Sequence, residues 1–523
     1  MRWLPLVLLA SGQMLIVSDV NALRISIGAI VDEFGISSAD VQTALVVYSL
    51  TTAAFVITSA KTGALYGSLR LFRGGALLFA TALTGVALST GPWMLVASQA
   101  AAGAAAAALL PAVVALVAAN YEGRQRAFAI GVVSAAGGAA AMVLAGVLGS
   151  VASWRLPFWI LATVAALVFI MSGRLEPTAR QRDVVIDWLG VLLSAGAIVL
   201  LTVAANGSSS WGIVVARPDA PFAPFGISPS LVLGLLAIVL GWLFSRHQHH
   251  RISHGRTPLV SPEAVESEAS RRALVAIVVT LGVCNGYAYL LPLYMQVVQG
   301  YDGLRTAIWM LPYALSLSAA AVWVTRLTAR FTVRTITRSS MLLMAAGFVI
   351  VGTGIADHWG NPVVILGLVL AGVGTGAVLT LGATVMVGAS GPALASEVGG
   401  VRHTAGNLGA AIGTALVGAL LVTALNILVD NAVAGSSALP PELKSRAQLE
   451  QPAFISNGDL EHEAEAYGLP QAQVREVVRI NTEERLNALR VCFFGLAAMA
   501  LLGAVVARGL PDEAQQATGS RRS

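Results

Sequence analysis

The chain has few charged residues. Asp, Glu, Lys and Arg make up 11% of its 523 residues, whereas hydrophobic residues make up 56% and the mean hydropathy is +0.77. A water-soluble domain cannot bury that much apolar surface, but a lipid bilayer can solvate it. The composition therefore excludes an ordinary soluble protein. In a membrane protein the net charge of +5 does not indicate a nucleic-acid partner, and we expect none.

Cysteine and lysine are scarce as well. The two cysteines, Cys284 and Cys492, fall within long apolar segments, so we expect neither a structural disulfide nor a cysteine metal site. Lysine occurs only at Lys61 and Lys444, and arginine supplies the other basic residues. Together with the many alanines and glycines, this usage hints at a GC-rich bacterial genome.

Motifs of ATP-driven or enzymatic chemistry are absent from the sequence. There is no Walker-type phosphate loop, which argues against direct use of ATP, and no Ser/His/Asp or zinc-protease pattern. The histidines between His247 and His254 lie among arginines, without acidic or cysteine neighbours, which favours a solvated loop over a metal site. We therefore expect no enzymatic activity, no metal and no cofactor.

Apolar segments of about twenty residues recur along the chain. Lipid offers no hydrogen-bond partners to the backbone, so spanning segments are helices or closed barrels. A barrel shows alternating strands of about ten residues, and runs such as 275–297 and 363–387 are longer. The fold class is therefore an all-α polytopic membrane protein. About fourteen transmembrane helices are expected, near 4–28, 41–61, 74–92, 93–119, 127–150, 157–173, 187–206, 229–245, 273–297, 305–325, 339–355, 362–388, 403–428 and 488–508.

The placement of basic residues predicts the orientation. Most of the arginines lie in loops on the side of the two termini, whereas the short loops on the other side hold only Arg155, Arg217 and Arg305. Basic loops face the cytoplasm. We therefore expect an N-in and C-in, multi-pass protein of a bacterial cytoplasmic (inner) membrane.

The spacing of the spans predicts four parts. Residues 1–180 form an N-terminal six-helix bundle, and 181–272 form two linker helices and a cytoplasmic loop. Residues 273–510 form a second six-helix bundle that includes an outer insertion at 429–487, and 511–523 form a cytoplasmic tail. The polar insertion is interpreted as a solvated segment, with a ligand-gathering lid as the alternative.

Several short motifs occur in the order known from one family. They are Asp19 in the first span, Tyr48 six residues after Gln42 in the second, Trp154-Arg155 before Pro157-Phe158, Asp187-Trp188 with Gly190, Trp211-Gly212, Pro258-Leu259, and Pro292-Leu293-Tyr294 with Gln296. With these motifs the chain resembles the major facilitator superfamily, specifically its fourteen-helix drug:proton antiporter branch. The resemblance covers nearly the whole chain and implies a multidrug or natural-product exporter built from two six-helix bundles.

The functional signatures of that branch are incomplete here. The loop after the second span has Gly67 and Ser68 where the branch has aspartate and arginine. Gln99 replaces an arginine of the fourth span that the branch links to proton transfer, and the proline of the fifth span is missing from 141–146. The repeat copy after the tenth span keeps Arg330.

Asp19 is the candidate proton-coupling residue. A charge in the bilayer costs about 2.5–3.5 kcal/mol on the permissive insertion scale, and no cation shares the helix face of Asp19, since Arg24 lies about 140° around the helix. The alternative is a carboxylate paired with another helix. The candidate substrate-binding residues are Asn21, Tyr48, Gln99, Asn285, Tyr287, Tyr289, Tyr294 and Gln296, with hydrogen bonding between helices as their alternative role. The candidate gating residues are Gly63, Arg70, Arg330, Arg402 and Asn407.

The first functional hypothesis is proton-coupled export of an amphipathic small molecule (a drug, a natural product or a lipid-like compound) by alternating access. The scarcity of cavity acids favours a neutral or weakly anionic substrate. The alternatives are a facilitator without coupling, and a non-transporting sensor or scaffold with a transporter fold. The expected partners are the substrate, protons and the lipid bilayer, and a monomer is favoured.

Overall fold

The computed structural model describes residues 3–36, 38–136, 153–178, 185–212, 214–217, 220–301, 303–356, 362–391, 394–437, 439–440, 457–466 and 469–510. Within these ranges the regular structure is helical, apart from an isolated bridge between Val215 and Ile227. Among the described residues, 13 helices are long and apolar enough to cross a membrane. The predicted all-α polytopic fold is therefore confirmed.

The first bundle holds the N-terminal helices and one extensive apolar core. Its helices are α1 (Trp3–Ile25), α2 (Ile27–Phe34), α3 (Ser38–Tyr66), α4 (Ser68–Ala87), α5 (Pro92–Asn120), α6 (Gly123–Ala136) and α8 (Leu156–Met171), followed by the 3-10 turn η1 (Ser172–Arg174). The span expected at 127–150 begins in α6 and continues outside the described residues.

The two linker helices pack side by side. They are α9 (Trp188–Trp211) and α10 (Pro229–Ser253), and the short turns η2 (Pro224–Gly226) and η3 (Pro262–Ala264) precede and follow α10. α9 begins where the Asp187 side chain accepts a hydrogen bond from the backbone N–H of Gly190, which satisfies one of the unpaired donors of a helix N-terminus. α9 also packs against α3 and against α15 (Ala395–Gly435), so the linker pair contacts both halves of the molecule.

The second bundle repeats the long-helix pattern around its own core. Its helices are α11 (Glu268–Leu293), the π-helix η4 (Tyr294–Val298), α12 (Gly303–Leu327), α13 (Val333–Gly354), α14 (Pro362–Ser390), α15 (Ala395–Gly435), α17 (Asn457–Ala466) and α18 (Gln471–Val506), followed by η6 (Ala507–Gly509). Glycines let these helices approach closely: a Cβ atom on Gly413 would lie 2.1 Å from the carbonyl oxygen of Gly282, so only glycine fits where α15 crosses α11.

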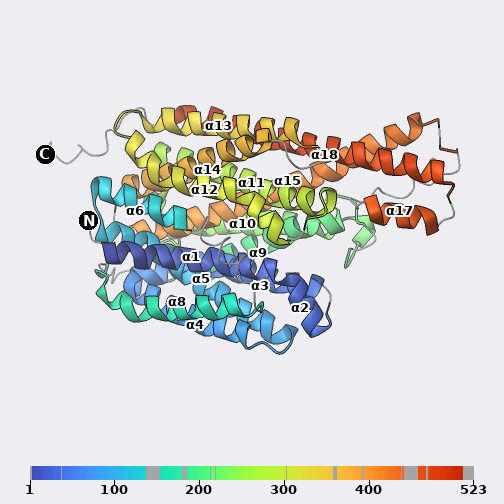
Figure 1. The fold of residues 1–523 in the computed structure, drawn as a ribbon. Coiled ribbons are helices and arrows are strands. Elements are labelled where there is room, and N and C mark those ends of the chain that lie inside the picture. Colours follow the sequence, from blue (N-terminus) through green and yellow to red (C-terminus); the bar gives the residue numbers. More distant parts are fainter. Residues whose placement is uncertain are drawn as a thin grey trace.

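α15 and α18 are longer than the spans expected from hydropathy. They contain 41 and 36 residues, or about 62 and 54 Å of helix at 1.5 Å per residue, against a hydrocarbon core of about 30 Å. Near the C-terminal end of α15, Val433 clusters with Ile480 of α18 and with Leu439, which follows α15, and Ser436 donates a hydrogen bond to Glu476 of α18. The two ends of the segment expected to be a solvated insertion are therefore helical extensions, which project at one end of the molecule (Figure 1).

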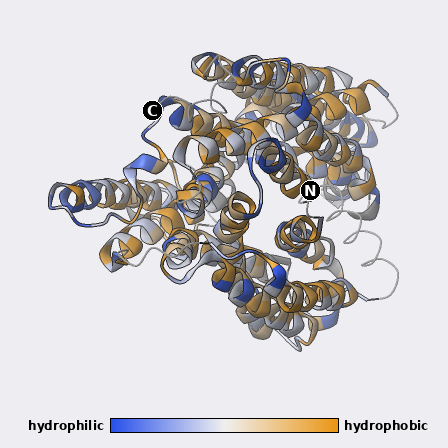
Figure 2. Cartoon of the chain, turned by 90° about the vertical axis from the view of Figure 1, so that its left-hand side faces the viewer, coloured by the Kyte–Doolittle hydropathy of each residue, from blue (hydrophilic) through white to orange (hydrophobic). Residues whose placement is uncertain are grey.

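Both ends of the described chain lie at the same end of the helical bundle (Figure 1). We call this end, where α1 begins and α18 ends, the terminal face. Figure 2 looks onto that face and shows most helices end on, with hydrophobic ribbon predominating. The other end, which carries α2 and α17, is the opposite face.

At the opposite face, Trp154 and Arg155 bind the carboxylate of Glu33. The Trp154 indole N–H donates to Glu33 Oε2 at 2.7 Å, and Arg155 Nη1 donates to the same oxygen at 2.5 Å. These hydrogen bonds, the one from Arg155 first, hold the pKa of Glu33 below its usual value. The Trp-Arg motif thus ties the start of α8 to α2.

Candidate functional site

The two bundles meet along a limited set of helices. α3 and α5 contact α15, and α6 contacts α12 and α14. Near the terminal face this interface contains an apolar cluster from both bundles, formed by Ala115, Ala118, Ala264, Ala273, Ile277, Val385, Met386, Val387, Ala395, Val398, Ala507 and Leu510. Two glycines allow the close approach: Gly399 lies against Pro111 and Gly400 against Ala60. The described conformation is therefore packed shut at this end of the interface.

A buried ion pair joins the bundles beside the apolar cluster. Lys61 on α3 donates from Nζ to Glu397 Oε1 on α15 at 2.7 Å, and the two side chains are 3% and 4% exposed. Ser261 supports the pair, because its backbone N–H donates to Glu397 Oε2 at 2.9 Å while Lys61 Nζ lies 3.4 Å from its hydroxyl. Ser396 adds a hydrogen bond to the carbonyl of Ala60. We call Lys61, Ser261 and Glu397 the latch.

The linker helices hold the segment that carries Ser261. Asp187 is 3% exposed and accepts hydrogen bonds from His247 and Gln248 on α10, each at 3.0 Å. The side-chain oxygen Oε1 of Gln248 accepts a hydrogen bond from the backbone N–H of Leu259 at 2.7 Å. A continuous chain of contacts thus runs from Asp187 through Gln248 and Leu259 to the latch.

Asp19 lies in the first bundle and contacts α5. It is 0% exposed, and Gln99 donates from Nε2 to Asp19 Oδ1 at 3.1 Å. Among the described residues neither Asp19 Oδ2 nor Gln99 Oε1 has a hydrogen-bond partner. The buried carboxylate therefore has a neutral donor on one oxygen and an open position on the other.

The crossing of α3 and α5 places Gln99 against α1. A Cβ atom on Gly103 would lie 2.4 Å from the carbonyl oxygen of Tyr48, so glycine permits this contact, and Thr52 bridges the helices by donating to the Gly103 carbonyl at 3.0 Å. Tyr48 is 5% exposed and donates from its hydroxyl to the Ile16 carbonyl of α1 at 3.4 Å. The structure thus brings three predicted residues, Asp19, Tyr48 and Gln99, into one buried group.

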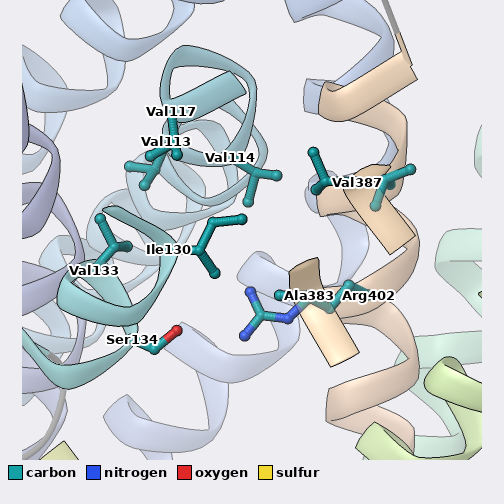
Figure 3. Close-up of a pocket in the computed structure, with 10 residues that line it drawn as sticks. Val113, Val114, Val117, Ile130, Val133, Ser134, Ala383, Val387 and Arg402 are labelled. Carbon is teal, nitrogen blue, oxygen red and sulfur yellow. The ribbon is translucent and has the colours of Figure 1, made fainter. Parts of the chain in front are cut away.

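Arg402 lines a small cavity between the bundles. The cavity is lined by Val113, Val114, Val117, Ile130, Val133, Ser134, Ala383, Val387, Val398 and Arg402, and has a volume of about 20 Å³. Figure 3 shows the guanidinium of Arg402 pointing across it toward Ile130 and Ser134 of α6. Because α15 begins at Ala395 rather than near 403, Arg402 lies about two turns inside the helix and not at its end.

The predicted polar residues of α11 do not form one group. Asn285 donates to the Leu281 carbonyl of its own helix, as Asn21 does to Val17 on α1. Tyr287 stacks on Tyr313 in the core with ring centroids 4.2 Å apart.

Further along the same segment, Tyr294 is 1% exposed and donates to the Ala356 carbonyl, whereas Gln296 in the π-helix is exposed. Tyr289 is half-buried and packs against the core of the second bundle.

The predicted gating residues fall into two sets. Gly63 is buried beside the latch, where a Cβ atom would lie 3.1 Å from the hydroxyl of Ser396. Arg402 and Asn407 are half-buried on α15. Arg70 and Arg330 are exposed, away from this buried interface.

Sequence reasoning missed the latch. Lys61 was noted only as a rare lysine at the end of the span expected at 41–61, and Glu397 precedes the span expected at 403–428. The signal in the sequence was the rarity of lysine, since Lys61 is one of two lysines in the chain; that α15 begins before Glu397 is known only from the structure.

Comparison with known proteins identifies the family and its relatives. The family model described as Major Facilitator Superfamily matches residues 9–414. The puromycin resistance protein pur8 of Streptomyces alboniger is 26% identical over 80% of this chain and 81% of its own length. The tetracenomycin C resistance and export protein of Streptomyces glaucescens is 26% identical over 80% of this chain and 76% of its own length. The multidrug efflux pump LfrA of Mycolicibacterium smegmatis is 23% identical over 82% of each chain.

Solved structures show the same fold. The human organic anion transporter MFSD10 matches with a TM-score of 0.59 and 14% identity, over 96% of this chain and 99% of that one. The proton:xylose symporter XylE matches with a TM-score of 0.53 and 10% identity, over 98% of this chain and 96% of that one. The family model matches most of this chain, and 13 of the described helices are long and apolar enough to cross a membrane. The chain therefore belongs to the Major Facilitator Superfamily and is a multi-pass membrane transporter.

Proposed function

We propose that the protein exports an amphipathic small molecule across the bacterial cytoplasmic membrane in exchange for protons. Similarity to proteins named for puromycin and tetracenomycin C resistance and for multidrug efflux supports export of drug-like compounds. The basic loops on the side of the termini support a cytoplasmic terminal face. In this orientation the latch closes the transporter toward the cytoplasm.

The proposed proton coupling is based on Asp19, whose carboxylate has a hydrogen-bond partner on only one of its two oxygens. Its Oδ1 accepts the Gln99 amide, and its Oδ2 is without a partner among the described residues. A proton on Oδ2 removes the charge while the Gln99 hydrogen bond stays in place. Without that proton the buried charge is poorly compensated, so deprotonation favours a conformation in which α1 or α5 moves and water reaches Asp19.

Alternating access then links the two buried groups. Opening the terminal face requires the Lys61–Glu397 pair to separate and hydrate, and closing it restores the pair. Export runs when substrate loads from the terminal face, the latch closes, and the substrate leaves at the opposite face as Asp19 accepts a proton there. We further propose that the working unit is a monomer.

The test is substrate flux in proteoliposomes under an imposed pH gradient. A panel of amphipathic dyes and antibiotics is assayed with the wild type and with Asp19→Asn, which is neutral and nearly isosteric. We expect gradient-driven flux in the wild type and its loss in Asp19→Asn, with the thermal unfolding of the purified protein preserved. Flux that is indifferent to both the gradient and the substitution would contradict proton coupling.

A facilitator is the second candidate, favoured by one observation. Gln99 stands where the antiporter branch that the chain resembles carries an arginine, so the partner of Asp19 is a neutral amide and not a cation. In that case counterflow down a substrate gradient would persist in Asp19→Asn at the wild-type rate, and the pH gradient would not accumulate substrate.

A further inference from the structure

Arg402 lies inside the interface of the two bundles, where the described residues supply it with no counter-charge. It lies on α15, and its Nε atom is buried without a hydrogen-bond partner. Among the described residues it has no ion pair either, in contrast to Glu397, which lies about one and a half turns earlier on α15 and pairs with Lys61. Even on the permissive insertion scale an arginine within the bilayer costs about 2.5–3.5 kcal/mol.

The helices around the cavity offer Arg402 no carboxylate. The lining residues come from α5, α6, α14 and α15, and Ser134 is the one uncharged polar side chain among them. α5, α6 and α14 contain no Asp or Glu, and neither does the following segment 137–152. On α15 the acidic residues are Glu397, which is held in the latch, and Asp430, which is 28 positions away, or about 42 Å of helix. His403, the neighbouring residue, adds no negative charge.

Its position makes Arg402 accessible when the latch opens. Arg402 follows Glu397 by five positions, about 7.5 Å of helix. Once the apolar cluster and the latch separate, water and solutes from the terminal face reach the guanidinium next. In the closed conformation the cavity of about 20 Å³ has room for little more than one water-sized group.

We propose that Arg402 is the loading site for the anionic group of the substrate, which makes amphipathic organic acids the preferred substrate class. The guanidinium binds a carboxylate or a similar oxyanion through paired N–H donors, and the valines of α5 and α14 pack against the apolar body. This inference rests on the proposed export function for its role in transport. An inorganic anion such as chloride is also attracted by the guanidinium and is the alternative ligand of this site.

Two dyes that share one ring system but carry opposite charges distinguish the effect of substrate charge from that of substrate size. Fluorescein is an anionic xanthene at neutral pH, and rhodamine 6G is a cationic xanthene ester. Binding of each dye to purified protein in detergent is measured by fluorescence anisotropy, and flux is measured in proteoliposomes. The variants are Arg402→Gln, which removes the charge, and Arg402→Lys, which keeps it; His403→Gln is the neighbouring control.

We expect Arg402→Gln to weaken fluorescein binding and raise its KM at least tenfold, with rhodamine 6G unchanged or improved. Arg402→Lys should retain most of the fluorescein affinity, and His403→Gln should resemble the wild type. Equal effects on both dyes, or none on fluorescein, would overturn the inference. Chloride titration that reveals an Arg402-dependent chloride site, without Arg402-dependent dye binding, would also overturn it, because the site would then serve an inorganic anion.

The two proposals fail in different ways. Arg402-dependent fluorescein binding without flux of any compound would leave the anion site standing and contradict the export function. Gradient-driven flux of rhodamine 6G, with fluorescein handling independent of Arg402, would support export and contradict the anion site.

Discussion

Glu397 and Asp19 are both carboxylates buried between helices, yet their surroundings differ. Glu397 is 4% exposed and has a partner on each oxygen, the Lys61 ammonium at 2.7 Å and the Ser261 backbone N–H at 2.9 Å. Asp19 is 0% exposed and accepts one hydrogen bond, from a neutral amide at 3.1 Å. Both side chains are buried, but only the negative charge of Glu397 is balanced by a cation.

This difference assigns different roles to the two groups. A buried carboxylate paired with an ammonium is compensated where it lies, so the Lys61–Glu397 pair can hold the two bundles together. A carboxylate that faces only a neutral donor is costly when charged and is easily neutralised by a proton. Under the proposed mechanism, the comparison therefore separates a contact that holds the bundles closed from a carboxylate that exchanges a proton, and both belong to the same conformational cycle.

Breaking the latch is expected to give the largest effect. Lys61→Met leaves Glu397 buried without its cation, and removing one partner of a buried pair costs about 3–5 kcal/mol. Opening the terminal face hydrates Glu397, so the population of the open conformation should rise. Maleimide labelling of a cysteine introduced at Val398, which is 0% exposed, should increase markedly from the side of the terminal face.

The control for this experiment is the double variant Lys61→Met/Glu397→Gln, which has no buried charge in the latch. Its labelling should return most of the way to that of the parent with Val398→Cys alone. Equal labelling of the single and double variants would show that the ion pair does not hold the bundles closed.

The linker contact should have a smaller effect of the same kind. Gln248→Ala removes the side chain that bridges Asp187 and the backbone N–H of Leu259, which leaves a buried donor without its partner, at about 1–3 kcal/mol. Labelling at Val398→Cys should rise, but less than in Lys61→Met. His249→Ala, next to it and exposed, should not change labelling. Unchanged labelling in Gln248→Ala would show that the linker helices do not stabilise the latch.

Adding a cation beside Asp19 should make that site resemble the latch. In Gln99→Arg the guanidinium would stabilise the charged carboxylate, so gradient-driven flux should fall several-fold at neutral pH and recover as the pH is lowered. Gln99→Met, which cannot pair, should keep gradient-driven flux. The same pH profile in both variants would mean that the charge of the neighbour does not control Asp19.

The exposed pair at the opposite face should have the smallest effect. Arg155 and Glu33 are 26% and 46% exposed, and such pairs contribute below about 1 kcal/mol. Because the pKa of Glu33 is lowered in the folded protein, its contribution is present at neutral pH and is lost as the pH falls through that lowered pKa. The Tm difference between the wild type and Glu33→Gln should therefore be small at pH 7 and vanish in acid; a difference that persists in acid would contradict this assignment.

The fold was largely predictable from sequence because hydropathy alone identifies spanning helices. The expected spans match α1, α3 and α5 to within several residues. The lengths of α15 and α18 were not predictable in this way, because a helix that continues outside the bilayer carries polar residues and leaves the hydropathy window. Glu397 lies in such an extension, before the apolar run begins.

The site was less predictable, because its groups are assembled from distant segments. Asp19 was identifiable as a charge in a span, but only the fold shows that Gln99, 80 positions later, is its partner. Tyr287 and Tyr294 were selected as polar aromatic residues and lie in the core, since an aromatic ring packs there as readily as it contacts a substrate. The Lys61–Glu397 pair spans 336 positions, beyond any local sequence pattern.

Infrared difference spectroscopy tests the contrast between Asp19 and Glu397 most directly, because the carbonyl stretch of a protonated carboxyl group is resolved from that of a carboxylate. Spectra of the purified protein in lipid are recorded during a titration from alkaline to mildly acidic pH. We expect a protonated-carboxyl band in the wild type that disappears in Asp19→Asn and remains in Glu397→Gln. A band that survives in Asp19→Asn and disappears in Glu397→Gln would contradict this expectation, because the latch would then carry the proton.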